Sequence, residues 1–304
     1  MTERVRIGTR GSPLALRQAR LVADALGRAW PGLGVELVPI KTTGDKRPDA
    51  NLAAEGGKGL FVKEIEEALL DGRVDLAVHS LKDLPAGTPK GLATAAFAER
   101  GDPRDVLVSR DGSTLDGLPV AARVGTSSPR RRAQLLAARP DLKVEAIRGN
   151  VDTRLRKLQD APYDALVLAA AGLHRLGLEP TGAVVLPPEV MLPAVGQGTL
   201  AVETREDDLE TRRVVAVVDH AETRAAALAE RAFLAAIGGS CTTAVAAYAR
   251  HEGAGLRLDA LVASPDGTRL LRYGRVLHRG TPSDLGDEVA RWLLEHGGRE
   301  VLEQ

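Results

Sequence analysis

One local pattern occurs twice in this chain and sets its fold class. A short predicted strand leads into a turn with serine followed by proline, and a stretch with helical spacing comes next. The turns hold Ser12 and Ser128, after the predicted strand segments 5–8 and 123–126. Serine is a preferred N-cap and proline a preferred first helical residue, so each turn predicts a helix start. Strand–turn–helix units predict parallel sheets covered by helices. The repetition therefore predicts two similar α/β domains that face each other across a cleft.

The last part of the chain follows a different pattern. Three consecutive strands and a helix are predicted there, which indicates a small α+β domain. Two connections are predicted to cross between the first two domains: the turn 100–104 and the proline-containing stretch 186–194. Two such crossings suit a hinge that closes on a ligand. The predicted domains are 1–99 with 199–217 (domain 1), 104–193 (domain 2) and 221–304 (domain 3).

Composition argues against several classes of function. The 304 residues carry 41 Lys+Arg and 41 Asp+Glu, so no net charge draws the chain to nucleic acid or an acidic membrane, and only 3% are aromatic. No apolar run has the length of a membrane span, and the first residues lack the apolar core of a signal peptide. Six scattered His and a single Cys predict no metal site. We expect a cytoplasmic protein without metal, membrane or nucleic-acid partners.

The stretch 74–85 holds the best candidate for a catalytic group. An apolar run at 75–78 predicts a buried strand, and polar residues including Lys82 and Asp83 follow before Pro85 ends regular structure. In open α/β sheets, ligands bind at the carboxyl ends of the strands, where this loop would lie. Taken alone, Asp83 could simply end a strand. Its significance depends on what surrounds it.

Arginines recur at the predicted strand-to-helix turns. A planar guanidinium binds carboxylate or phosphate through two parallel hydrogen bonds, and basic residues in a first helical turn oppose the helix dipole unless an anion is present. The set therefore predicts a ligand with several carboxylates or phosphates, beside which one carboxylate, Asp83, could stabilise a cation or donate a proton. The arginines are Arg10, Arg130, Arg131, Arg148 and Arg154.

The single cysteine has unusual neighbours. Cys241 follows Gly-Gly-Ser and precedes Thr-Thr, a composition typical of an exposed loop rather than of a packed core. A thiol nucleophile usually needs a histidine base, and none is near in sequence. The thiol could instead be an attachment point for a prosthetic group. A second loop, 41–59, is long, polar and glycine-rich, as functional lids and disordered segments are.

Six segments, in order, resemble the porphobilinogen deaminase (hydroxymethylbilane synthase) family. The resemblance extends from residue 4 to about residue 250. Three departures stand out: the cysteine loop lacks a following proline, Ala54 stands where relatives often have Lys, and Pro129 follows Ser128. The matching segments are 6–16, 56–64, 77–85, 124–128, 148–151 and 192–198.

The resemblance implies a fold and a reaction. The fold would be two type II periplasmic-binding-protein-like domains around a cleft plus the small C-terminal domain. The activity would be condensation of four porphobilinogen molecules into hydroxymethylbilane with loss of ammonia, on a dipyrromethane bound to Cys241 by a thioether. The product would pass to uroporphyrinogen-III synthase, and the enzyme would be a monomer. A non-catalytic solute-binding or sensor protein for a polycarboxylate remains the alternative, since it would share the cleft without needing Asp83 or the cysteine.

The resemblance also implies roles for individual residues. Asp83 would be the catalytic carboxylate. Cofactor-binding roles are implied for Cys241, Lys82, Asp83, Thr126, Ser127, Ser128, Arg130, Arg131, Arg148 and Gly149. Substrate-binding roles are implied for Arg10, Ser12, Gln18, Lys58, Phe61, Arg148, Arg154, Arg175 and Gln197.

Overall fold

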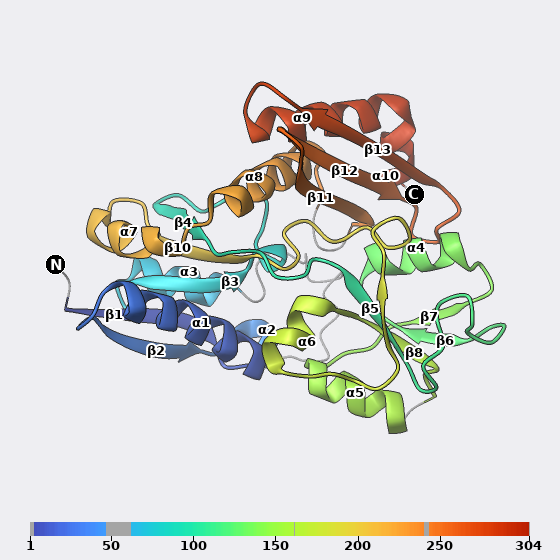
Figure 1. Ribbon diagram of the computed structural model, residues 1–304, viewed down its shortest axis with the longest axis horizontal. Helices are drawn as coiled ribbons and strands as arrows, with labels where there is room; N and C mark the ends of the chain where they lie inside the picture. The colour runs from blue at the N-terminus through green and yellow to red at the C-terminus, as the bar shows by residue number, and fades with distance from the viewer. Residues whose placement is uncertain (1–2, 47–61, 161, 240–242, 304) are drawn as a thin grey trace.

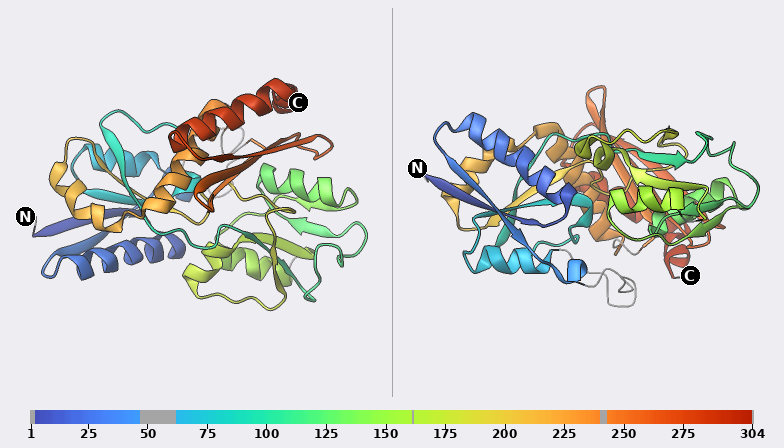
Figure 2. Two further views of the ribbon diagram at one scale, coloured as in Figure 1. Left: turned by 45° about the horizontal axis from the view of Figure 1, so that its top comes forward. Right: turned by 90° about the horizontal axis from the view of Figure 1, so that it is seen from below.

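The computed structural model describes residues 3–46, 62–160, 162–239 and 243–303 (Figure 1). These residues form two five-stranded sheets and one three-stranded sheet, all flanked by helices. The views in Figures 1 and 2 agree that the first two sheets lie at opposite ends of the molecule, with the third domain on one side. Among the described residues, no helix is both long enough and apolar enough to span a bilayer.

The first sheet is mixed, in the order β2-β1-β3-β10-β4. The strands β2, β1 and β3 run parallel, and β10 pairs antiparallel with β3 on one side and β4 on the other. Its strands are β1 (Arg4–Arg10), β2 (Gly34–Ile40), β3 (Leu76–Ser80), β4 (Leu92–Phe97) and β10 (Leu200–Arg205).

Helices cover both faces of this sheet. Helix α1 begins as predicted: the Ser12 hydroxyl accepts a hydrogen bond from the Ala15 amide at 3.2 Å, and Pro13 is the first helical residue. Apolar side chains of α1 and α7 pack on one face, and those of α3 pack on the other. The helices are α1 (Pro13–Ala29), the short α2 (Thr43–Lys46), α3 (Lys63–Leu70) and α7 (Leu209–Val215).

The second sheet repeats this plan, in the order β7-β6-β8-β5-β9. Here β7, β6 and β8 run parallel, and β5 is the antiparallel strand between β8 and β9. Helix α4 covers one face, and α5 and α6 cover the other. The elements are β5 (Asp105–Ser109), β6 (Arg123–Gly125), α4 (Pro129–Ala138), β7 (Lys143–Glu145), α5 (Val151–Asp160), β8 (Ala165–Ala169), α6 (Ala170–Leu176) and β9 (Ala183–Leu186).

The third domain is a three-stranded antiparallel sheet with helices on one face. The other face packs on Ala133 of α4 and on Leu192, so this domain rests on the second one. Its main elements are α8 (Ala221–Ala236), β11 (Val245–Glu252), β12 (Gly255–Ala263), β13 (Leu270–Leu277), α9 (Pro282–Leu293) and α10 (Arg299–Leu302).

A buried ion pair holds the two connections between the first two sheets against the third domain. Glu230 of α8 is fully buried, and its carboxylate accepts from Arg100 at 2.6 Å, from the Gly196 amide at 2.6 Å and from the Ala249 amide at 2.8 Å. Arg100 also donates to the Gln197 carbonyl at 2.8 Å. Arg100 lies in the first connection, between β4 and β5, and residues 196–197 lie in the second, between β9 and β10. One carboxylate therefore anchors both.

The predicted fold class is confirmed: two similar α/β domains and a small α+β domain. The sequence interpretation assigned no strand to β5 or β9, which complete the second sheet. Within the predicted loop 41–59, residues 43–46 form the short α2, and 47–59 lie outside the described residues. The exact domain limits drawn from the sequence stay predictions.

Candidate functional site

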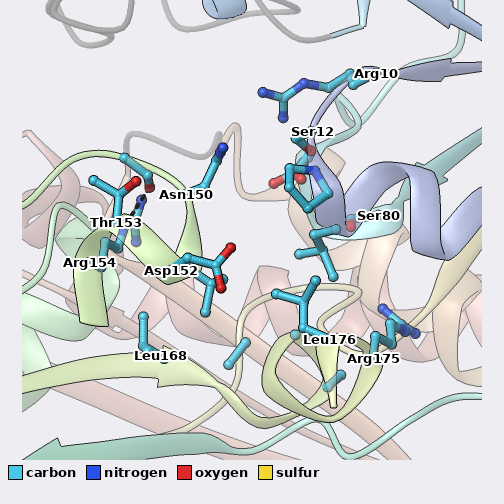
Figure 3. A pocket seen from close by; sticks show the side chains of 18 of the residues that line it. Arg10, Ser12, Ser80, Asn150, Asp152, Thr153, Arg154, Leu168, Arg175 and Leu176 are labelled. Carbon is cyan, nitrogen blue, oxygen red and sulfur yellow. Dashed lines mark hydrogen bonds between the residues drawn. The ribbon is translucent and has the colours of Figure 1, made fainter. Parts of the chain in front are cut away.

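A cavity of about 640 Å³ lies between the first two sheets, at the carboxyl ends of their parallel strands. Figure 3 shows Arg10 and Ser12 on one side of it and Asn150 and Arg154 on the facing side. The site residues of the sequence prediction that line this cavity are Arg10, Ser12, Gln18, Lys82, Asp83, Ser127, Arg131, Arg148, Gly149, Arg154 and Arg175.

The turn that carries Lys82 and Asp83 directly follows β3. Residues 81–83 form one turn of 3₁₀ helix, fixed by the Leu81 amide donating to the Thr199 carbonyl at 3.0 Å. The Leu81 side chain is buried in an apolar cluster, so Lys82 and Asp83 are directed away from the core. Before the turn, Gln18 of α1 donates to the Ser80 hydroxyl at 2.9 Å. Asp83 itself is exposed to the cavity.

Lys82 is half-buried at the cavity wall. Burial lowers the pKa of its amine to about 8; the Asp83 carboxylate opposes this shift, and the guanidinium of Arg131 adds to it. The amine contacts the Gln197 side-chain oxygen at 3.4 Å. An amine with this pKa is partly uncharged near neutral pH, so Lys82 can donate or accept a proton beside Asp83.

Arg130 and Arg131 share one buried carboxylate, that of Asp105. Arg130 donates to it at 2.8 Å and Arg131 at 2.6 Å, and each arginine also donates to a backbone carbonyl, of Leu192 and of Val167 respectively. Gln197 donates to the same carboxylate at 3.0 Å. The two guanidinium groups hold the pKa of Asp105 well below its usual range despite burial, while burial lowers the pKa of Arg130.

This network corrects one expectation from the sequence. Arg130 and Arg131 were expected to depend on a bound anion to balance their charges. Asp105 already neutralises one of the two charges inside the protein. The network therefore holds a fixed pair of guanidinium groups at the cleft with one net positive charge.

Two further arginines, Arg154 and Arg175, line the cavity on the side of the second domain. The half-buried Arg154 donates to the Gly149 carbonyl at 2.8 Å; burial lowers its pKa, the Arg131 guanidinium lowers it further, and Asp83 opposes the shift. Burial lowers the pKa of Arg175 to about 10, and its guanidinium donates to the Gly198 carbonyl. Lowered pKa values in guanidinium groups show that each would gain from a nearby anion.

Gly149 permits the tight turn between Arg148 and α5. Its φ is +113°, a backbone conformation that favours glycine, and an added Cβ would lie 2.7 Å from the Thr153 side chain. The backbone there consequently approaches the start of α5 closely. This keeps Asn150 at the cavity wall, where Figure 3 shows it.

A second cavity, of about 200 Å³, connects this region with the third domain. Lys82, Asp83 and Arg131 line both cavities. The Nε of Arg130 is buried and has no hydrogen-bond partner among the described residues. The further lining residues include Ser128, Arg130, Ala194, Val195, Gln197, Leu234, Thr243 and Val245.

Some predicted site residues are not gathered in these two cavities. Thr126 is buried, accepts from the Ser128 amide at 3.2 Å, and lines a separate cavity of about 440 Å³ beside the third domain. Ser127 borders that cavity as well as the large one, and its hydroxyl is engaged, donating to the Ile147 carbonyl at 2.7 Å. Three further predicted site residues, Lys58, Phe61 and Cys241, lie outside the described residues.

Sequence reasoning missed three residues at the cleft. Asp105 organises the arginine pair, and Asn150 and Asp152 line the large cavity. A signal for Asp105 was present in the sequence: an acidic residue opens an otherwise apolar run, 105–108, that would be buried in a sheet. A carboxylate in that position needs a buried cationic partner.

Solved structures give likenesses at low identity. YhfZ from Shigella flexneri is 20% identical, with 75% of this chain and 88% of that chain covered and a TM-score of 0.39. The probable amino-acid ABC transporter extracellular-binding protein ytmK from Bacillus subtilis is 11% identical (71% and 89% covered, TM-score 0.43). The Salmonella typhimurium periplasmic binding protein STM4351 is 12% identical (71% and 92%, 0.39). With TM-scores below 0.5, these likenesses carry no argument about ligand or activity.

Family comparison is specific. A model described as the dipyromethane cofactor binding domain of porphobilinogen deaminase matches residues 5–213, and one described as the porphobilinogen deaminase C-terminal domain matches residues 224–295. The two matches span both α/β domains and most of the third domain, and they confirm the resemblance noted in the sequence. The chain therefore belongs to the porphobilinogen deaminase family, enzymes of tetrapyrrole biosynthesis whose cofactor is dipyrromethane.

Proposed function

We propose that this protein is a hydroxymethylbilane synthase. It condenses four porphobilinogen molecules head to tail, and the balance is four porphobilinogens and one water giving one hydroxymethylbilane and four ammonia. The primer is a dipyrromethane joined by a thioether to Cys241. The product is expected to pass to uroporphyrinogen-III synthase, and the enzyme is expected to act as a cytoplasmic monomer.

One observation carries this proposal: a single turn presents a carboxylate, Asp83, to a cavity whose facing wall carries arginines from the other domain. Each porphobilinogen brings an acetate and a propionate, so a growing chain brings many carboxylates. Guanidinium groups on both sides of the cavity suit those anions. The Asp83 carboxylate, on the turn that faces these arginines, suits the cation that forms on the substrate's pyrrole ring when ammonia leaves.

The smaller cavity is the place that we propose for the dipyrromethane. It extends from Asp83 to Thr243, which is two residues after Cys241 in the sequence. A dipyrromethane carries four carboxylates, and the buried Nε of Arg130, without a partner among the described residues, is a donor of the kind such a group needs. The residues that would hold the cofactor are Lys82, Ser128, Arg130 and Arg131, with Cys241 as its attachment point.

The residues at the cleft have distinct tasks in the proposed reaction. When bound, the dipyrromethane supplies a nucleophilic pyrrole carbon on which the chain is built. Asp83 stabilises the cation left on the substrate when the bond between its aminomethyl carbon and nitrogen breaks, and then accepts the proton released from the pyrrole ring. Arg148, Arg154 and Arg10 hold the acetate and propionate groups, so that successive rings are oriented alike.

Lys82 supplies a neighbouring site for a proton. Its pKa of about 8 leaves part of the population neutral at working pH, and it lies beside the carboxylate that must lose a proton in every cycle. Its contact with Gln197 links it to the Asp105 network. With a pKa of about 8, Lys82 is mostly protonated near neutral pH, so it keeps the local field positive for substrate carboxylates and gives up its proton more readily than an exposed lysine.

The test is incubation of the purified protein with porphobilinogen. We expect ammonia release together with a product that cyclises to uroporphyrin, and intact-protein mass spectrometry should show one dipyrromethane on the polypeptide. Cys241→Ser should lack that mass and be inactive. Porphobilinogen binding without ammonia release would favour the solute-binding alternative. A bare polypeptide mass in fully active enzyme would contradict covalent attachment.

A further inference from the structure

A buried pair of ionisable side chains lies behind the turn that carries Lys82 and Asp83. His79 of β3 is 6% exposed and Glu203 of β10 is 1% exposed. The His79 Nε2 and the Glu203 Oε2 are 3.4 Å apart. Neither atom has a geometrically regular hydrogen bond among the described residues. No task in the proposed reaction uses this pair.

The pairing register explains why the two side chains meet. In the antiparallel pair of β3 with β10, Ala201 lies opposite His79 and Glu203 lies opposite Ala77. His79 and Glu203 are therefore diagonal neighbours on one face of the sheet. That face is the one packed against α3, because Ala77 belongs to the apolar cluster around Ile65. Ser80, next in the chain, points to the opposite face, where it meets Gln18 of α1.

Two further charged groups reach the pair from the helices that cover it. The Glu66 side chain comes from α3, and its pKa is raised to about 7, first by burial and then by the Glu203 carboxylate, while His79 opposes the shift. Arg231 comes from α8; burial lowers its pKa and the Glu203 carboxylate opposes the shift, and its guanidinium donates to the Ala86 carbonyl at 2.8 Å. The pair between β3 and β10 therefore lies within electrostatic reach of one side chain from α3 and one from α8.

Stability alone does not account for such a pair. Replacing a buried ion pair by apolar groups of similar size is often neutral or stabilising, because desolvation offsets the attraction between the charges. A buried polar pair does favour the arrangement in which its two members face each other, since separating them would leave each buried group with no polar neighbour at all. The His79–Glu203 contact links the end of β3 to β10 immediately before the turn 81–83.

We propose that His79 and Glu203 are a positioning pair, which holds the turn 81–83 in the orientation that presents Lys82 and Asp83 to the cleft. The pair acts through the backbone: with β3 pinned to β10, the Leu81 amide stays on the Thr199 carbonyl and Lys82 stays beside Gln197. This inference rests on the proposed function for its catalytic readout. Its second readout, the titration of Lys82, does not depend on activity.

The experiment compares the His79–Glu203 pair, at the end of β3, with the Arg6–Asp75 ion pair, just before the start of β3. His79→Leu and Glu203→Gln remove the pair at the end of β3, and His79→Gln restores a neutral donor of similar reach. Asp75→Asn is the matched control: Asp75 precedes β3, binds Arg6 at 2.7 Å, and is remote from the turn. For each variant, the rate of acylation of Lys82 is measured across pH by peptide mass spectrometry, which gives the midpoint of its titration. In addition, kcat and KM are measured with porphobilinogen.

We expect His79→Leu and Glu203→Gln to raise the midpoint of Lys82 acylation by about one pH unit from its value of about 8, because the amine loses part of its burial. In the same variants kcat should fall by about tenfold with KM little changed. His79→Gln should recover most of both. Asp75→Asn should lower the melting temperature but leave the midpoint and kcat near the wild-type values.

Three results would overturn the inference. The first is an unchanged Lys82 midpoint in folded His79→Leu or Glu203→Gln. The second is an equal loss of kcat in Asp75→Asn, which would mean that general loosening of β3 is sufficient. The third is no recovery in His79→Gln. If His79→Leu does not fold, Glu203→Gln and His79→Gln still decide. Wild-type protein that releases no ammonia would refute the proposed function, and the acylation midpoints would still test the positioning pair.

Discussion

Helices α1 and α4 begin in the same way and lead to opposite electrostatic arrangements. Ser12 caps α1 through the Ala15 amide and Ser128 caps α4 through the Arg131 amide, and a proline follows each serine. After the cap, α1 continues with apolar residues, while α4 continues with three arginines. The same serine–proline cap therefore begins both helices, but α1 packs on its sheet through apolar residues, whereas α4 places fixed positive charge at its start.

The difference shows how a duplicated plan acquires two roles. In the second domain, the buried Asp105 at the start of β5 neutralises part of the positive charge of Arg130 and Arg131 in α4. In the first domain, the carboxylate of interest, Asp83, lies on a turn at the cavity rather than under a helix. Under the proposed reaction, the second domain holds carboxylates of the ligand together with Arg10 of the first domain, and the first domain also handles the cation and the proton.

The largest effect is expected from Asp105→Asn. It leaves the buried guanidinium groups of Arg130 and Arg131 without their anionic partner, which costs roughly 3–5 kcal/mol of unfolding free energy. Denaturant titration measures this. Because the pKa of Asp105 is lowered in the folded protein, its contribution is complete above its unfolded value of 3.8 and is lost as pH falls below that. The Asp105→Asn variant should lack this loss of stability in acid. If variant and wild type had equal unfolding free energies at pH 7, Asp105 would not be the partner that balances the α4 arginines, and the contrast between the two domains would fail.

Asp83→Asn is expected to act on turnover rather than on folding. Removing one electrostatic contact to a developing charge typically costs about 3–4 kcal/mol of activation free energy, so kcat should fall by two to three orders of magnitude. The melting temperature should stay near the wild-type value, because Asp83 is exposed. Asp152→Asn, on the facing wall, should lose far less; equal losses would show that the second domain shares the catalytic role.

Arg131→Leu and Arg148→Leu separate two uses of arginine in the second domain. Both should interrupt the series of enzyme–pyrrole intermediates, which native mass spectrometry counts after substrate addition. Only Arg131→Leu should also destabilise the fold, by about 2 kcal/mol, because Arg131 is bound to the buried Asp105. An unchanged series in both variants would contradict carboxylate binding. Equal destabilisation would mean that Arg148 is as structural as Arg131.

The smallest effects are expected at the helix caps. Ser12→Ala and Ser128→Ala should each cost about 1 kcal/mol of unfolding free energy, since each removes one hydrogen bond to a helix amide. The caps lie in different domains, so the double variant should lose the sum of the two effects within about 0.5 kcal/mol. Strong coupling between them in denaturant titration would show that the two helix starts are linked across the cleft.

Local signals were sufficient for much of the fold. Serine-proline turns, apolar periodicity and the polar turn after β3 predicted both α/β domains, the third domain and the location of Asp83. They failed at β5 and β9. Strand β5 begins with Asp105, and its meaning depends on Arg130 and Arg131, which are 25 and 26 residues away. Strand β9 has only four residues at a sheet edge, too few for a clear alternation.

The candidate site shows the same division. Arginines at strand-to-helix turns could be predicted as a set, because parallel strands bring their carboxyl ends to one edge. The sequence could not predict which of these arginines would form ion pairs within the protein, because that depends on side chains from distant strands. Cys241 lies outside the described residues, so its role stays a prediction from the sequence and the family.

The position of β10 has a consequence for how the chain is made. This strand lies between β3 and β4 in the first sheet, yet it follows the whole second domain in the sequence. During synthesis, the second sheet, formed by residues 105–186, has all its strands before β10 leaves the ribosome. Until then, β3 and β4 of the first sheet lack the strand that pairs with both of them. The nascent chain thus acquires the support for its Lys82–Asp83 turn only after the arginine-bearing domain is complete.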